Sequence, residues 1–221
     1  MVLELGETTV LTDPVLRNRV AHLVRPGPAW HARYAAPDVV LISHGHRDHL
    51  DRPSLGLLDR GARVVVPRGL GKAITRLGFE DVIEVEEGDD VNVGLRIRVT
   101  HAEHNGHAVG YLLGGVYFAG DTDVFPEMAG LRSDVALLPV GGWGPRIPAG
   151  HLDPARDAQD LQLLRPHVAI PIHWGGFRPF YKRAPYRADA GQEFAELASV
   201  AAPDVEVRVL QPGETHFIHT G

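Results

Sequence analysis

Apolar runs that end in histidine or aspartate recur along this chain. Residues 38–43 have the pattern of a buried strand that stops at His44, and residues 168–172 have the pattern of another that stops at His173. Residues 117–119 lead in the same way to Gly120-Asp121. The pattern therefore predicts several strands that deliver polar side chains to one edge of a sheet, where those side chains can converge.

The rest of the pattern predicts helices and strands that alternate at first, after which strands dominate. Helices are expected at residues 53–59, 69–77, 153–164 and 190–201. Asp153-Pro154 is a strong N-cap and first-turn pair, and Gly114-Gly115 predicts a two-residue hairpin turn. The other strands are expected at residues 8–12, 62–66, 82–85, 91–100, 108–113, 116–119, 135–138 and 205–210, and residues 17–37 are expected to form a loop.

The run His44-Gly45-His46-Arg47-Asp48-His49 holds four possible metal ligands. Neutral imidazole and carboxylate groups bind zinc, iron or manganese, and the close spacing lets one loop serve two neighbouring ions. A polar loop that is histidine-rich by chance is the plain alternative. His104, Asp121 and His173 add three more candidates further along the chain, so a metal site is the better interpretation of the whole set.

At these residues the chain resembles the metallo-β-lactamase fold superfamily, whose H-x-H-x-D-H motif is matched by His44, His46, Asp48 and His49. The resemblance covers nearly the whole chain. It implies an α/β fold, a four-layer αββα sandwich with mixed and antiparallel sheets, formed by residues 1–221 as a single domain. It also implies two ions, the first held by His44, His46 and His104, the second by Asp48, His49 and His173, with Asp121 bridging them.

Within the superfamily the chain is most similar to the branch of ascorbate-6-phosphate lactonases and N-acyl-phosphatidylethanolamine-hydrolysing phospholipase D. The segments that carry this likeness are Leu11-Thr12-Asp13-Pro14, Gly150-His151-Leu152-Asp153-Pro154 and Pro171-Ile172-His173-Trp174-Gly175. Gly176 stands where the branch often has threonine. The branch usually has a strand ahead of a segment like residues 2–5, so a late start or a missing first strand, with an unpaired sheet edge, is expected.

Two ions roughly 3.5 to 4 Å apart can share a hydroxide formed near neutral pH and polarise the bond it attacks. The predicted function is therefore a metal-dependent hydrolase that cleaves a phosphodiester, a lactone or a related small ester. Two divalent ions are expected, with Zn²⁺ preferred and Mn²⁺ or iron as alternatives. Asp48 and Asp121 are predicted to be catalytic as well as ligands. By the resemblance His151 would contact the substrate and donate a proton or hydrogen bond, unless it only braces its loop.

The segment 141–146 lies between Asp121 and His151 and is predicted to form a pocket wall. Trp143 and Arg146 are the expected substrate contacts there, Arg146 for an anionic group, although the segment could be only a tight turn packed by Trp143. An apolar and basic rim is expected from Phe177, Phe180, Tyr181, Lys182 and Arg183. His101 and His107 are interpreted as non-ligands.

The composition of the chain limits the partners and the ligand chemistry that can be expected. The net charge of −6 gives no reason to expect a basic surface for nucleic acid or an anionic membrane, and the absence of cysteine excludes disulfides and thiolate ligands. No signal-like or membrane-spanning run is evident, so a cytoplasmic protein with a small-molecule substrate is expected and a homo-oligomer is left open. An iron-dependent redox enzyme of the same fold, a nuclease and a binding protein with a degenerate site remain the alternatives.

Overall fold

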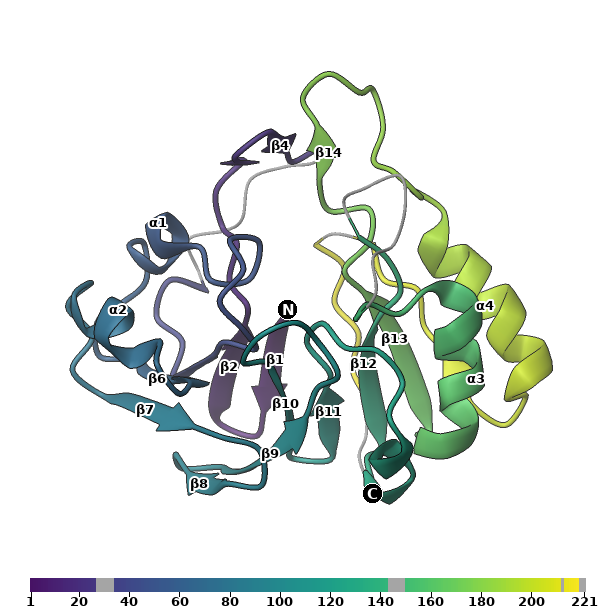
Figure 1. The fold of residues 1–221 in the computed structure, drawn as a ribbon, viewed down its shortest axis with the longest axis horizontal. Coiled ribbons are helices and arrows are strands. Elements are labelled where there is room, and N and C mark those ends of the chain that lie inside the picture. Colours follow the sequence, from purple (N-terminus) through teal and green to yellow (C-terminus); the bar gives the residue numbers. More distant parts are fainter. Residues whose placement is uncertain (27–33, 143–149, 212, 219–221) are drawn as a thin grey trace.

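The computed structural model describes residues 1–26, 34–142, 150–211 and 213–218. Two β-sheets pack face to face, and helices cover their outer surfaces (Figure 1). The strand order is β1-β2-β5-β6-β7 in one sheet and β15-β13-β12-β11-β10-β9-β8 in the other, and both sheets mix parallel and antiparallel pairs. The αββα sandwich expected from the sequence is confirmed.

The five-stranded sheet consists of β1 (Val2–Leu5), β2 (Thr8–Thr12), β5 (Val39–Leu41), β6 (Arg63–Pro67) and β7 (Val82–Val85). The seven-stranded sheet consists of β8 (Asp90–Asn92), β9 (Arg96–His101), β10 (Val109–Leu113), β11 (Val116–Phe118), β12 (Val135–Pro139), β13 (Val168–Ile172) and β15 (Glu206–Val207). The helices are α1 (Arg52–Leu55), α2 (Gly71–Thr75), the 3-10 helix η2 (Pro126–Gly130), α3 (Pro154–Leu164) and α4 (Ala190–Ala201).

Three apolar cores lie between the four layers. The largest fills the space between the two sheets, a second lies beneath α3 and α4, and a third lies beneath α1 and α2. Alternation along β11 shows how one strand serves two cores, because Val116 and Phe118 face the other sheet while Tyr117 faces the helices. Both faces of the central strands are therefore buried, which explains why their sequences are almost continuously apolar.

Local signals in the sequence explain several elements. Asp153 caps α3 by accepting hydrogen bonds from the backbone amides of Ala155 and Arg156, as its sequence predicts. Gly114 and Gly115 both have positive φ, +50° and +76°, which a two-residue hairpin of this kind requires. The single strand expected at residues 91–100 is wrong, because the chain turns at Gly94 (φ +89°) and divides it into β8 and β9.

A second difference concerns the loop expected at residues 17–37. This stretch contains β3 (Arg19–Val20) and β4 (Leu23–Val24), and β4 pairs with β14 (Arg178–Pro179) from far along the chain. Residues 18–26 and 177–187, which we call the arm, project from the body at the top of Figure 1.

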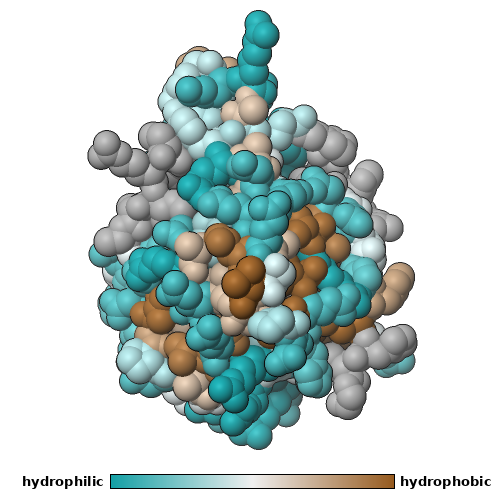
Figure 2. Space-filling model, turned by 90° about the vertical axis from the view of Figure 1, so that its right-hand side faces the viewer, coloured by the Kyte–Doolittle hydropathy of each residue, from teal (hydrophilic) through white to brown (hydrophobic). Residues whose placement is uncertain are grey.

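The outer face of α3 and α4 is shown in Figure 2. Leu163, Leu197 and Val200 are exposed on these helices, with Val200 the most accessible at 84%. Among the described residues, no helix combines the length and the apolar character needed to cross a membrane.

Candidate metal centre

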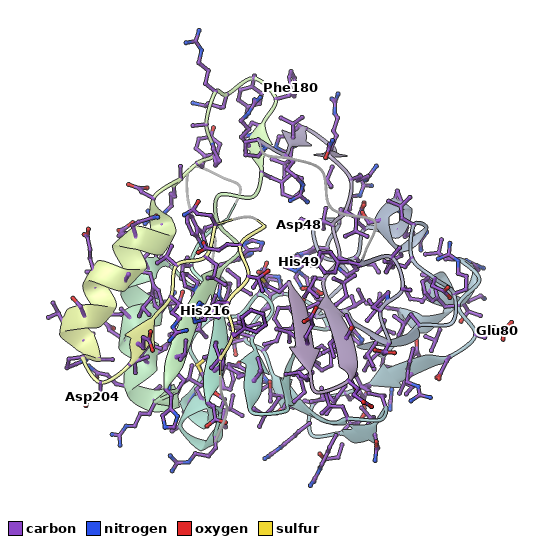
Figure 3. All side chains as sticks on the ribbon, turned by 180° about the vertical axis from the view of Figure 1, so that it is seen from behind. Asp48, His49, Glu80, Phe180, Asp204 and His216 are labelled. Atoms are coloured by element: carbon purple, nitrogen blue, oxygen red, sulfur yellow. The ribbon has the colours of Figure 1, made fainter. Side chains whose placement is uncertain are left out.

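Polar side chains meet where strands of both sheets end. Asp13 follows β2 and the run His44–His49 follows β5, while Asp121 follows β11 and His173 follows β13. His104 lies in the loop after β9. Figure 3 shows Asp48 and His49 at this edge, below the arm. The structure thus brings together all seven side chains that the sequence predicts as metal ligands.

One cluster consists of His44, His46 and His104, each of which has one ring nitrogen within 4.8 Å of those of the other two. Nε2 of His44 is 2.9 Å from Nδ1 of His46, and Nε2 of His104 is 3.3 Å from the same atom. His44 is buried and His46 is exposed, so the cluster opens from the interior toward solvent.

A second cluster consists of Asp48, His49 and His173. The Nε2 atoms of His49 and His173 are 3.2 Å apart, and Oδ2 of Asp48 lies 3.7 and 3.6 Å from them. This grouping joins the loop after β5 in one sheet to the end of β13 in the other.

Asp121 lies between the two clusters and is 2% exposed. Its Oδ2 is 3.2 Å from Nε2 of His49 and 3.9 Å from Nε2 of His44, and its Oδ1 is 3.5 Å from Nε2 of His173. Gly120 makes this position possible, since a Cβ there would lie 2.5 Å from the Cβ of Ser43, and its φ is +63°. One carboxylate therefore faces both clusters.

The far nitrogens of three imidazoles are held by hydrogen bonds. Nδ1 of His49 lies 2.6 Å from Oδ2 of Asp13, a carboxylate that also accepts hydrogen bonds from the amide and hydroxyl of Ser43. Nδ1 of His104 donates to the carbonyl of Gly150, and Nδ1 of His173 donates to that of Gly141. Such contacts fix the ring orientation and leave Nε2 free to bind a metal.

Asp13 is a member of the site for which the sequence alone predicts no role, although it lies in one of the segments that carry the resemblance. The available signal is its position directly after β2, at the same sheet edge as the histidine run. Two residues here have positive φ without being glycine, Asp13 at +40° and His173 at +60°. Strained backbone of this kind is concentrated at functional sites.

Burial and neighbouring charges set the ionisation of the site. Burial disfavours the charged form of Asp121, but the imidazoles of His173 and His49 outweigh it and hold the pKa of this carboxyl well below its usual value. Burial also disfavours a charged His49, yet the carboxylates of Asp121 and Asp13 raise its pKa well above the usual value. Burial, reinforced by His49, lowers the pKa of His44 to about 3, so this imidazole is neutral, the form that binds metal.

The donor set fits divalent metal ions. Imidazole nitrogen and carboxylate oxygen suit zinc, iron and manganese, and each cluster has three such donors pointing at a common region. Oδ1 of Asp121 is buried without a hydrogen-bond partner among the described residues. A cation between the clusters would satisfy this oxygen and relieve the contact between facing ring nitrogens.

His151 lies at the same place. Its Nε2 is 3.2 Å from Oδ2 of Asp121, and its buried Nδ1 has no hydrogen-bond partner among the described residues. It also forms another possible metal-binding group with His104 and Asp121. The predicted substrate contacts Trp143 and Arg146 lie outside the described residues.

His101, at the end of β9, and His107, in the loop after it, line a cavity of about 310 Å³ that His104 also lines. His101 contacts Glu87 and Glu103 instead of the clusters, as expected for a non-ligand. The residues expected as an apolar and basic rim belong to the arm, and Figure 3 places Phe180 at its outer end, away from Asp48.

Comparison with known proteins agrees with this geometry. Residues 8–174 match the family model described as β-lactamase superfamily domain. A UPF0173 metal-dependent hydrolase of Methanopyrus kandleri is 32% identical over 96% of this chain and 94% of its own length. Among solved structures, a metallo hydrolase of Ignicoccus hospitalis has a TM-score of 0.71 at 28% identity, covering 99% of this chain and 94% of that one. An isothiocyanate hydrolase from Delia radicum gut bacteria (TM-score 0.72, 20% identity, 98% and 95% covered) shares the fold.

Proposed function

The chain belongs to the β-lactamase superfamily and to its UPF0173 metal-dependent hydrolases, and on this premise we propose that it hydrolyses a phosphodiester, a phosphorylated lactone or a related small ester with two divalent ions. The observation that carries the proposal is the buried carboxylate of Asp121, which lies beside His49 and His173 of one group of three donors and beside His44 of the other. The segments shared with the lactonase and phospholipase D branch support this substrate class.

His44, His46 and His104 would hold one ion, Asp48, His49 and His173 the other, and Asp121 both. When bound, such a pair of ions supplies a hydroxide nucleophile near neutral pH and polarises the bond that is attacked. Zinc is our first choice because the donors are mainly imidazole, with manganese and iron as alternatives.

The protein's own residues prepare the site. Asp13, Gly141 and Gly150 hold three imidazoles in place before substrate arrives, so no reorganisation is needed during the reaction. Asp48 and Asp121 orient the attacking water through their carboxylate oxygens. His151 donates a proton or a hydrogen bond to the oxygen that gains charge, because its imidazole lies beside Asp121 and is 15% exposed.

Metal analysis combined with a substrate panel tests the proposal. The protein is purified without added metal, its metal content is measured, and its turnover is assayed on bis(p-nitrophenyl) phosphate and on lactones. Two equivalents of metal and hydrolysis that a chelator abolishes are expected. A single iron per chain with no hydrolysis would support the redox alternative and contradict the proposal.

A further inference from the structure

The arm differs in charge from the rest of the molecule. Residues 18–26 and 177–187 contain six Lys or Arg and no Asp or Glu, although acidic residues outnumber basic ones in the whole chain by 28 to 22. Pairing of β4 with β14 brings these two distant segments together. The net charge of −6 therefore conceals a local basic surface.

Most of these cations have no carboxylate partner among the described residues. Arg187 pairs with Glu193, but no ion pair with a described residue engages the other five, Arg19, Arg25, Arg178, Lys182 and Arg183. Arg178 donates to backbone carbonyls of the arm itself, and Arg25 stacks on Phe177 with its guanidinium carbon 4.6 Å from the ring centre. Arg19, Lys182 and Arg183 are the exposed members of this set, and their charges are accessible to an external partner.

Large apolar side chains lie beside these charges. Residues 180–184 are all exposed, and within them Phe180 is 58% and Tyr181 63% accessible. The backbone that holds them is ordered by hydrogen bonds from the amide of Phe180 to the carbonyl of His22 and from the amide of Lys182 to that of Pro179. Figure 3 shows Phe180 at the outer end of the arm. Cations next to exposed aromatic rings suit a partner that presents anionic charge over an apolar layer.

We propose that the arm docks on an anionic lipid bilayer, with Phe180 and Tyr181 in the interface and the arm's cations among the headgroups. Each exposed Lys or Arg near such a surface favours binding by about 1 kcal/mol. The three exposed cations of the arm, Arg19, Lys182 and Arg183, form no ion pair with a described residue and can hold the protein there reversibly. The proposal does not depend on the substrate of the metal centre.

Two other partners fit the same surface less well. Single-stranded nucleic acid needs open ring faces for its bases, but Arg19 covers the ring of Phe180 at 5.7 Å and Tyr181 packs edge-on against it at 5.4 Å. A second copy could offer the acidic stretch 80–90, but most of its carboxylates already have partners. The partners there include Arg63 with Asp81, Arg68 with Glu86 and Arg96 with Asp90.

Sedimentation with sucrose-loaded vesicles tests the docking directly. The metal-loaded protein is mixed with vesicles of pure phosphatidylcholine and with vesicles that also contain phosphatidylglycerol. We expect binding to the anionic vesicles only, and loss of that binding as salt is raised. In the double variant Lys182→Gln/Arg183→Gln the partition coefficient should fall about thirtyfold, and Phe180→Ser/Tyr181→Ser should also weaken binding.

The matched control is Arg76→Gln/Arg132→Gln, which removes the same charge from exposed positions outside the arm. This variant should bind as the original protein does. Equal binding to neutral vesicles, no binding at low salt, or unchanged binding of the arm variants would overturn the proposal. So would preferential binding of a single-stranded oligonucleotide in fluorescence anisotropy, or a dimer in light scattering that the arm variants abolish.

Discussion

Asp160 is a buried carboxyl group whose titration should control how the stability of the fold depends on pH. It lies on the buried side of α3 and is 2% exposed, and its Oδ2 has no hydrogen-bond partner among the described residues. Asp157, one turn earlier, is equally buried and both of its oxygens lack partners among those residues. Burial raises the pKa of Asp160 from 3.8 to about 7.

The sign follows from the direction in which the pKa moves. Because the folded pKa is raised, the folded state binds the proton more tightly than the unfolded state, so the stability it contributes is present at low pH and is lost as pH rises toward 7. A pKa that differs by one between the folded and unfolded states corresponds to about 1.4 kcal/mol. Between about pH 5 and about pH 8 the loss from Asp160 is therefore about 3 kcal/mol, or about 10 °C in Tm for a domain of this size.

The test compares urea unfolding of the original protein with that of Asp160→Asn at several pH values. The asparagine variant keeps the shape of the side chain but cannot ionise. Its unfolding free energy, relative to that of the original protein, should therefore rise by about 3 kcal/mol between about pH 5 and about pH 8. Metal binding changes stability with pH in both proteins and cancels in the difference. The exposed Asp204→Asn serves as a control. Parallel pH curves for the original protein and Asp160→Asn would refute the reasoning.

Four further changes test the proposed metal centre. His46→Ala removes a proposed ligand and should abolish hydrolysis and lower the Tm, since metal bound to the folded state stabilises it. Unchanged metal content would contradict the assignment of His46 as a ligand. Asp121→Asn should reduce bound metal from two equivalents toward one, whereas two ions and full turnover would show that it does not bridge. His151→Ala should keep both metals and lose on the order of 10²-fold in kcat; a loss of stability larger than the loss of kcat would mean that it only braces its loop. Asp13→Asn should weaken metal affinity by about 10- to 100-fold, because Asp13 orients the imidazole of His49. Metal competition with a chelator measures the affinity, and an unchanged value would show that Asp13 does not orient His49 for metal binding.

Much of the scaffold can be predicted because its signals are local. The strand at residues 168–172 and the helix at residues 190–201 have the bounds expected from sequence, since an uninterrupted apolar run and an amphipathic stretch each specify one structure. The seven proposed ligands can also be identified from the sequence, because short motifs carry them and the fold brings those motifs to one edge. Whether they bind two ions stays a prediction.

What the sequence does not reveal depends on contacts between distant segments. β4 and β14 are only two residues long, and they pair with each other although they are about 155 residues apart in sequence, a partnership that no local pattern encodes. β3 is equally short and pairs with β4. The contact of Asp13 with His49 is likewise a consequence of β2 and β5 lying side by side. The turn at Gly94 escapes prediction because the apolar residues on either side have the pattern of one strand.

The two donor clusters, together with Asp121 and Asp13, draw on five separate strand ends, and the segments between those ends leave from the same edge of the sandwich. Such a segment can change in length or in charge without moving the imidazoles. The positions of the imidazoles are fixed by the sheets and by Asp13, Gly141 and Gly150. The arm is built from two such segments. Insertion and deletion at this edge therefore offer natural selection a route to new substrates or new locations that leaves the chemistry intact, and the same positions are where an engineer should graft new loops.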